Sequence, residues 1–198
     1  MANFFVVDQT KLVKGAARIM YAPSAETDPV KIGDVIDTST YAAQGTWKDL
    51  GATREGIQIT VNNTESGFDV DQVAGLIGTS PENWECSVST NLAEVTLEHL
   101  VIAWEGASIT SGTGPSERIT GFAGATSYTE RRLAVMFQKP DDKIVGYLFH
   151  RAVRAPQEGT LNFQKGGDAQ VIPVRFNILA DATQSDPLTA FFLVAEQL

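Results

Sequence analysis

The chain has 198 residues, of which 43% are apolar, and its 24 acidic and 15 basic residues leave a formal net charge of −9 at pH 7. This length and apolar share are sufficient for one folded domain over residues 1–198 with a substantial core. The negative charge argues against a protein that grips nucleic acid through its phosphates, because that function requires clustered Lys and Arg.

The chain opens with an N-terminal arm over residues 1–15, which contains a short apolar run at residues 4–7. This run is too short to cross a membrane, and Lys11 and Lys14 follow it rather than precede it, unlike the pattern of a signal peptide. Residues 16–21 predict a first strand. No later run approaches the length of a membrane span, so no membrane partner is expected.

Residues 22–53 predict a long loop, because they are rich in Gly, Pro, Ser, Thr and Asp and lack a clear period. The loop also contains large apolar side chains, which argues against free disorder. We expect it to pack on another surface, with a neighbouring subunit as one candidate. The apolar residues concerned are Val30, Ile32, Val35, Ile36, Tyr41 and Trp47.

Three stretches with alternating apolar and polar residues follow, at residues 55–61, 68–73 and 84–89, and each predicts a strand with one buried face. The polar faces are unusual because no Lys or Arg occurs between Glu55 and Glu117. An ordinary solvated sheet face mixes both signs of charge. Cys86 is the only cysteine and lies in the third stretch, which favours a buried thiol over a nucleophile and excludes an intrachain disulfide.

Residues 91–105 predict the only helix, with Asn91 as its N-cap and Glu94 at the third helical position. The helix would have two apolar faces, one of which includes Val95, His99 and Ile102. A surface helix needs only one apolar stripe, so two stripes imply burial from two sides. The second cover is either a loop of the same chain or a neighbouring subunit.

The second half predicts further strands. Residues 108–129 read as an exposed loop or irregular hairpin, and residues 132–138 and 144–150 as a hairpin joined by a turn. Residues 171–179 predict a last strand, in which Pro173 indicates an edge or a bulge. A C-terminal arm over residues 182–198 is too apolar to remain in water, and we expect it to occupy a groove.

The search for catalytic chemistry is negative. His99 and His150 have no Cys, Asp or His at a metal-ligand spacing, and both are expected to be structural. The glycine-rich residues 111–116 lack the Lys and Ser/Thr that a phosphate-binding loop needs. We therefore expect no catalytic residue, no metal site and no cofactor, and an enzyme is the weaker hypothesis.

Three motifs together resemble the major tail tube protein of long-tailed bacteriophages. They are WKDLGATREGIQIT at residues 47–60, the strand 68–73 with its Asp71-Gln72 pair, and residues 84–89 leading into NLAEVTLEHL at 91–100. The resemblance covers residues 47–104 in motif and the remainder only in layout. It implies an antiparallel β-sandwich or small barrel flanked by one helix, and hexameric rings that stack into a tube through which the genome passes.

The resemblance also implies the partners and the location: copies of the same chain, the tail terminator, tape measure and distal tail proteins, and a virion tail assembled in the host bacterial cytoplasm. Double-stranded DNA would pass without specific binding, repelled by an acidic wall. If the polar strand faces point at the channel, the lining residues are Gln58, Thr60, Asn62, Asp69, Asp71, Glu85, Ser87 and Ser89. The alternative is that these residues only keep the protein soluble.

The contacts between subunits would come from the arms, the long loop and the second helix face. We expect them at Phe4, Phe5, Val30, Ile32, Val35, Ile36, Tyr41, Trp47, Val95, Ile102, Phe191 and Phe192. A tube of one protein needs such contacts both within a ring and between stacked rings.

Two other classes remain open. One is a related tail or tube part, either a tail terminator, a head–tail completion protein, or a tube protein of a bacteriocin or type VI secretion system. The other is a β-sandwich that binds carbohydrate, which would expose aromatic residues on one sheet face. Trp47, Trp84 and Trp104 are instead expected on a loop, a core-facing strand position and the helix stripe.

Overall fold

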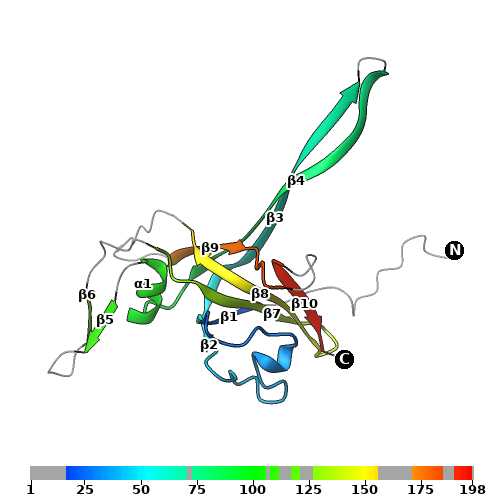
Figure 1. Ribbon diagram of the computed structural model, residues 1–198. Helices are drawn as coiled ribbons and strands as arrows, with labels where there is room; N and C mark the ends of the chain where they lie inside the picture. The colour runs from blue at the N-terminus through cyan, green and yellow to red at the C-terminus, as the bar shows by residue number, and fades with distance from the viewer. Residues whose placement is uncertain are drawn as a thin grey trace.

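The computed structural model describes residues 17–70, 73–105, 108–111, 117–120, 127–155, 171–184 and 190–197. The protein is mainly β, with an antiparallel sheet of eight strands and one α-helix (Figure 1). The expected fold class, a mainly β antiparallel fold with a single α-helix, is confirmed. The elements are β1 Ala17–Pro23, the 3-10 helix η2 Ile32–Asp34, β2 Lys48–Asp49, β3 Thr53–Val70, β4 Val73–Leu92, α1 Leu97–Ala103, β5 Ser108–Ser111, β6 Glu117–Thr120, β7 Arg131–Gln138, β8 Ile144–Arg154, β9 Ile172–Leu179 and β10 Phe192–Glu196.

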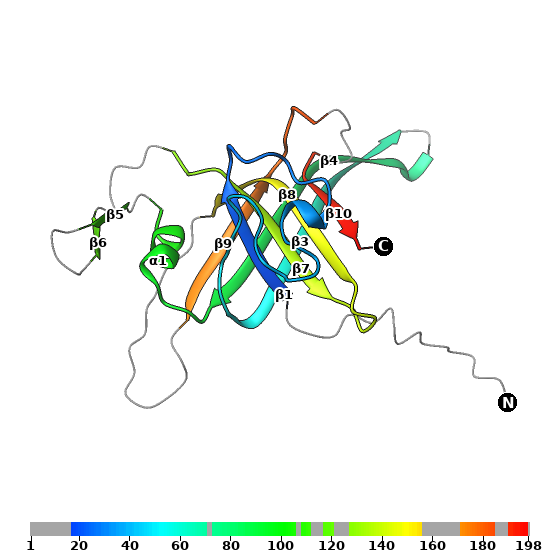
Figure 2. The ribbon, with the colours of Figure 1, turned by 90° about the horizontal axis from the view of Figure 1, so that it is seen from below.

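The main sheet has the strand order β2-β1-β7-β8-β9-β4-β3, and β5 and β6 form a separate hairpin. Strand β8 has two neighbours on one side, because its first half pairs with β10 and its last residues, 151–154, pair with β9. The sheet therefore branches at β8, with β10 beside one part of this strand and β9 beside the other (Figure 2). In the strand order, β3 is the last strand at the edge that lies beyond β9 and β4.

Strands β7 and β8 are buried on both faces. Along β7, Leu133 and Val135 belong to the larger core cluster, whereas Ala134 and Met136 belong to a second cluster. Because successive side chains of a strand point to opposite faces, the two clusters lie on opposite sides of the sheet. The larger one includes Ile102 of α1, and the second is covered by the loop that follows β1.

The three strands predicted between residues 55 and 89 are in fact two. Strand β3 runs for 18 residues and β4 for 20, and they pair as one long hairpin. The stretch 68–73 was expected to be one strand, but residues 68–70 end β3, residues 71–72 lie outside the described residues, and residue 73 begins β4. In its outer half the ladder continues in register through Gly67, which pairs with Thr79, and a shift of register lies next to Pro81, between Thr64 and Glu65 on the opposite strand.

The helix is shorter than expected, because residues 91 and 92 belong to β4. Asn91 is paired with strands on both sides, so its backbone cannot start a helix. Thr96 is the N-cap instead, and its hydroxyl accepts a hydrogen bond from the His99 N–H at 3.2 Å. The Glu94 carboxylate accepts from the backbone N–H of Ala52 at 3.2 Å, which ties the start of β3 to the approach to the helix.

The remaining elements mostly follow their predictions. The hairpin β7–β8 and the strand β9 are confirmed, and residues 108–111 and 117–120 form an irregular hairpin. Pro173 pairs with Asn91 of β4, and its other side would face residues beyond 155 that lie outside the described residues, so the edge or bulge at Pro173 stays a prediction. Residues 192–196 of the C-terminal arm bind to their own chain, where they form β10 and pair with β8.

Candidate functional site

A polar face extends across β3, β4 and β9. The registers Gln58↔Ser89, Thr60↔Ser87 and Asn62↔Glu85 place six of the predicted lining residues opposite one another. Directly opposed residues of an antiparallel pair have their side chains on the same face of the sheet. The intervening residues, such as Cys86 and Val88, are buried in the core on the other face. The predicted grouping of these six side chains is therefore found, whereas the channel they would line stays a prediction.

Of the other two predicted lining residues, Asp69 belongs to the end of β3, and Asp71 lies outside the described residues.

Arg175 of β9 joins this face and was not predicted. It pairs in register with Ser89, and its Nη2 atom lies 3.4 Å from the Ser87 Oγ atom. Arg175 and Glu85 both line a polar hollow of about 340 Å³ on the sheet. The expectation of a face free of Lys and Arg is therefore wrong, because it was made from residues 55–117 and did not include β9.

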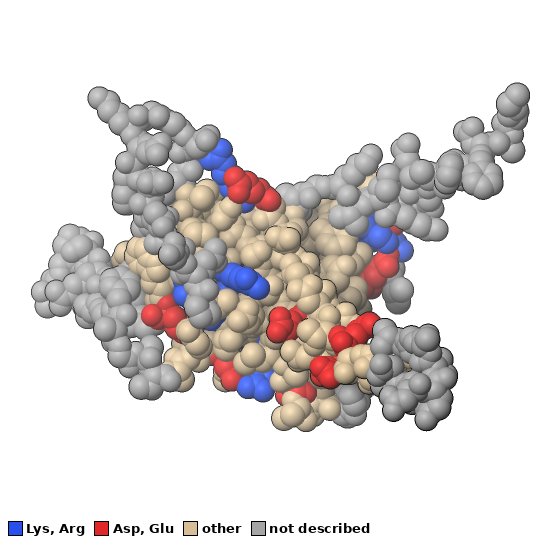
Figure 3. Space-filling view, turned by 90° about the horizontal axis from the view of Figure 1, so that it is seen from above, with Lys and Arg blue, Asp and Glu red and all other residues tan. Residues whose placement is uncertain are grey.

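Other charges near this face are neutralised in pairs. Arg151 of β8 binds the Glu130 carboxylate through two nitrogen atoms, at 3.1 and 2.7 Å. These hydrogen bonds lower the pKa of Glu130 and raise that of Arg151. The surface seen from above likewise has small groups of both signs separated by uncharged residues (Figure 3). The charge pattern is mixed and sparse.

The outer half of the β3–β4 hairpin extends far beyond the rest of the sheet (Figure 1). Residues 61–67 and 79–85 are all exposed. Three of the exposed side chains on the hairpin are large and apolar, with Val61 46%, Ile77 49% and Trp84 51% exposed. Trp84 lies on the core-facing side of β4, as expected, but the core ends before it, so the expectation of a buried side chain there is wrong.

The base of the hairpin borders an apolar groove of about 690 Å³. Ile57, Ile59 and Val61 of β3 line one side. The other side is formed mainly by Val135, Phe137, Tyr147 and Phe192, from β7, β8 and β10. Val61 belongs both to this groove and to the exposed part of the hairpin, so the groove reaches the base of the exposed part.

Several residues predicted to contact other subunits are buried within their own chain. Ile32, Val35, Ile36 and Trp47 are each at most 4% exposed and pack against β1, β7 and β8. Ile102 of α1 is 4% exposed in the larger core. These five side chains are unavailable to a second subunit, which corrects that part of the prediction. The sequence pattern identified buried residues but not the surface that covers them.

The other predicted contact residues have different surroundings. Val30, Tyr41 and Val95 are exposed, at 67%, 45% and 46%. Phe191 and Phe192 are partly buried against the larger core, and Phe4 and Phe5 lie outside the described residues. Val30, Tyr41 and Val95 therefore remain candidates for a contact with another subunit.

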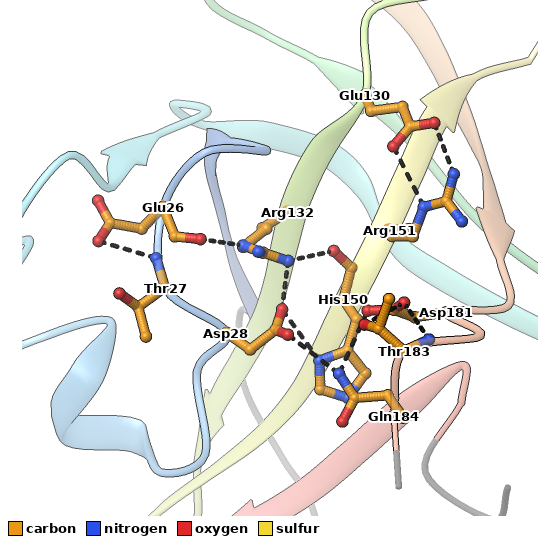
Figure 4. A network of polar contacts seen from close by, with 10 residues as sticks. All are labelled: Glu26, Thr27, Asp28, Glu130, Arg132, His150, Arg151, Asp181, Thr183 and Gln184. Carbon is orange, nitrogen blue, oxygen red and sulfur yellow. Dashed lines mark hydrogen bonds and ion pairs between the residues drawn. The ribbon is translucent and has the colours of Figure 1, made fainter.

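A polar network lies on the side of the sheet that the long loop covers (Figure 4). Arg132 forms an ion pair with Asp28 and donates hydrogen bonds to the backbone oxygens of Glu26, at 2.7 Å, and His150, at 2.8 Å. The His150 Nδ1 atom is 3.5 Å from the Asp28 carboxylate, and His150 is only 3% exposed. The network therefore joins the long loop to β7 and β8.

Nothing among the described residues suggests catalysis. They contain no group of three or more His, Cys, Asp or Glu that could hold a metal ion. Burial raises the pKa of Cys86 to about 11, which keeps its thiol protonated and weakly nucleophilic at neutral pH. The His99 Nδ1 atom lies 2.7 Å from the backbone oxygen of Glu94, a structural contact at the start of α1. No helix in the described part of the chain is long and apolar enough to cross a membrane.

Comparison with models of protein families gives no match to this chain, and comparison with curated protein sequences gives no significant match. The resemblance to tail tube proteins therefore rests on the three motifs quoted above.

Proposed function

We propose that this protein is a structural subunit that assembles with copies of itself into hexameric rings, stacked into a phage tail tube for genome delivery. The observation that supports this most strongly is the uncovered apolar surface of the β3–β4 hairpin. A two-stranded ribbon is marginally stable in water by itself, and exposed apolar groups on monomers are often functional. Val61, Ile77 and Trp84 are each about half exposed on this ribbon, and Val61 also lines the apolar groove at its base, so a partner that covers the ribbon would bury them.

The edge of the sheet supports the choice of a second copy as that partner. Strand β3 pairs with β4 on one side and is the last strand of the sheet on the other. Its 18 residues make a long edge, and such edges invite pairing with another chain. Joining the sheets of successive copies around a ring would remove every such edge.

The polar face of β3, β4 and β9 is the proposed channel wall. A DNA duplex has about one negative charge per 1.7 Å of its axis, so a wall rich in Lys and Arg would bind it. Uncharged Gln, Thr, Asn and Ser side chains predominate on this face. Glu85 and Arg175 line the same hollow, and their formal charges offset each other. Such a wall would neither grip nor strongly repel DNA, which replaces the purely acidic wall expected from the sequence.

The proposed partners follow from this role. They are copies of the same chain within and between rings, and the terminator, tape measure and distal tail proteins at the ends and inside of the tube. The proposed location is the tail of the virion, after assembly in the host cytoplasm.

Electron microscopy of the purified protein tests the proposal. We expect hollow tubes or six-membered rings at high protein concentration, because the uncovered hairpin surfaces would be buried between copies. A protein that stays monomeric at every concentration, by microscopy and by light scattering, would contradict it. A ring that does not stack would favour a terminator or completion protein instead.

A second candidate, a module that binds carbohydrate, is favoured by the exposed indole of Trp84. The polar hollow, where amide and carboxylate groups could bind hydroxyls, lies on the opposite face of the same strand, so the two features would not form a single site. Titration with a panel of oligosaccharides, followed by tryptophan fluorescence, tests this candidate. A saturable change that Trp84→Ala abolishes would support carbohydrate binding.

A further inference from the structure

The C-terminal strand β10 is held more loosely than its neighbour β9. Four side chains of β9 are at most 4% exposed, whereas no side chain of β10 is buried and Val194 is 53% exposed. Phe192 packs against the larger core, with its ring centre 5.6 Å from that of Phe149 and 6.2 Å from that of Tyr147, and Leu193 and Ala195 pack against the second cluster. The backbone ladder with β8 and these partly buried contacts hold β10 in place.

The contacts that close the end of β10 are at the surface. Lys139 forms an ion pair with Glu196, whose side chain is 49% exposed. The backbone N–H of Gln197 donates to the Ile144 oxygen at 2.8 Å, and the Ile144 N–H donates to the Gln197 side chain at 3.3 Å. Exposed ion pairs contribute little to stability, so these contacts align the strand without fixing it strongly.

The segment before β10 is anchored differently. The Gln184 side-chain amide donates to Asp28 at 3.0 Å and to Asp181 at 3.2 Å (Figure 4). Asp28 is in turn paired with Arg132, and Asp181 is only 6% exposed. The polar network therefore fixes residues 181–184 on the long loop and β7. A strand with a fixed base and no fully buried side chain can be replaced by an equivalent strand, which would restore its contacts with the two clusters and the hydrogen bond from the Asp181 N–H to the Ala190 oxygen.

We infer that β10 is an exchangeable strand, and that residues 144–149 of β8 form the surface that receives β10 of a second copy. The β10 strand of another copy would make the same contacts with β8 as the chain's own β10 does. The pairing of β10 with β8 within one chain therefore shows how the exchanged strand would bind. The exchange replaces one five-residue ladder with another, so little burial is lost when it is complete. The inference rests on the proposed assembly and names one contact that joins its copies.

The anchored base limits which copies can exchange strands. Six residue steps separate Gln184 from Ala190, and an extended chain of that length spans at most about 20 Å. The receiving β8 must therefore lie within this reach of Gln184. Only a directly adjacent copy satisfies that condition, so exchange would link neighbours rather than distant subunits.

Isotope mixing tests the exchange with the unmodified protein. Equal amounts of subunits labelled with nitrogen-14 and nitrogen-15 are mixed before assembly, and the assembled protein is treated with a zero-length carbodiimide. This reagent activates the Glu196 carboxyl, and the Lys139 amine displaces the activating group to form an amide with net loss of water. With complete exchange, we expect about half of the Lys139–Glu196 peptides to combine both isotopes, because donor and acceptor chains pair at random.

The Lys48–Glu98 ion pair is the matched control. Its atoms are 3.1 Å apart, and both residues belong to the body of one chain, so its crosslinked peptide should contain one isotope only. Lys139–Glu196 peptides of one isotope only would overturn the inference, and so would the absence of that crosslink. Mixed peptides at both ion pairs would also overturn it, because they indicate random crosslinking.

Microscopy of the same samples separates this inference from the proposed function. Tubes without mixed Lys139–Glu196 peptides would leave the assembly intact and exclude the exchange. Mixed peptides in a protein that forms only small oligomers would support the exchange and contradict the tube.

Discussion

Trp47 and Trp84 differ in how much the rest of the chain covers them, and this difference distinguishes two regions of the sheet. Trp47 of the long loop is 4% exposed, whereas Trp84 is 51% exposed on the hairpin. Around Trp47, β1, β7 and β8 have a core on both faces. Beyond Trp84, among the residues that the structure describes, the two strands of the hairpin pair only with each other. The chain thus completes its own core at one end and leaves an apolar surface at the other, which is the pattern expected of a subunit.

The largest effect should follow from Trp47→Ala. Removing a large buried aromatic side chain leaves a cavity and costs about 3–5 kcal/mol of unfolding free energy. Chemical denaturation of the monomer measures this loss. A cost below about 1 kcal/mol would mean that the loop does not form a core with β1, β7 and β8.

Asp28→Ala should have the next largest effect. The change leaves Arg132, whose side chain is only 12% exposed, without its ion-pair partner. The expected loss is about 1–3 kcal/mol, because Asp28 is itself partly exposed and solvent screens the pair. Glu98→Ala is the control, since both side chains of the Lys48–Glu98 pair are 57% exposed and its loss should cost about 0–1 kcal/mol. Equal costs for the two variants would contradict the structural role of the network.

A smaller effect is expected from acid, at Asp181. Hydrogen bonds from the backbone N–H and the hydroxyl of Thr183 lower the pKa of Asp181 from 3.8 to about 2. A pKa that is lower in the folded state stabilises the protein above the unfolded value, and this contribution is lost as the pH falls towards 2. Wild-type stability should therefore decrease more steeply than that of Asp181→Asn below about pH 4. Denaturation curves at a series of pH values measure the difference, and parallel profiles would contradict it.

The smallest effect on stability should come from Trp84→Ala. Its side chain is half exposed in the monomer, so the unfolding free energy should change by about 0.5 kcal/mol or less. Assembly should nevertheless be lost or strongly weakened, because large aromatic residues often dominate the energy of an interface. Light scattering measures assembly, and Thr79→Ala on the same hairpin is the control. Normal assembly of Trp84→Ala would remove this residue from the proposed interface.

Much of the fold could be predicted from hydrophobic patterns and turn residues. The buried residues of β9, such as Phe176, follow from a period of two, whereas the hairpin β7–β8 follows from two apolar runs joined by a turn. The sequence did not reveal that β3 and β4 are two long strands rather than three short ones. Gly67 and Pro81 resemble turn residues, although the ladder continues past both. The helix start was misplaced because Asn91 has the chemistry of an N-cap but is held in the sheet by two neighbouring strands.

For the candidate site, the sequence predicted which residues share a face of their strand but not which strands lie next to one another. Alternation assigns Gln58, Thr60 and Ser87 to a polar face, since that is a local property of each strand. It cannot identify which strands lie side by side, and the pairing of Ser89 with Arg175 joins distant parts of the chain. The exposure of Trp84 was missed because alternation identifies the face of a residue but not where the core ends.

Oxidative footprinting of dispersed and assembled protein tests the central claim most directly. The account predicts that Trp84, Val61 and Ile77 react readily in the monomer and become protected on assembly, while Tyr128, which is 48% exposed and lies outside the proposed interface, serves as the internal reference. Hairpin residues that react equally in both states would show that copies do not cover this surface, and the proposed assembly would then lose its main support.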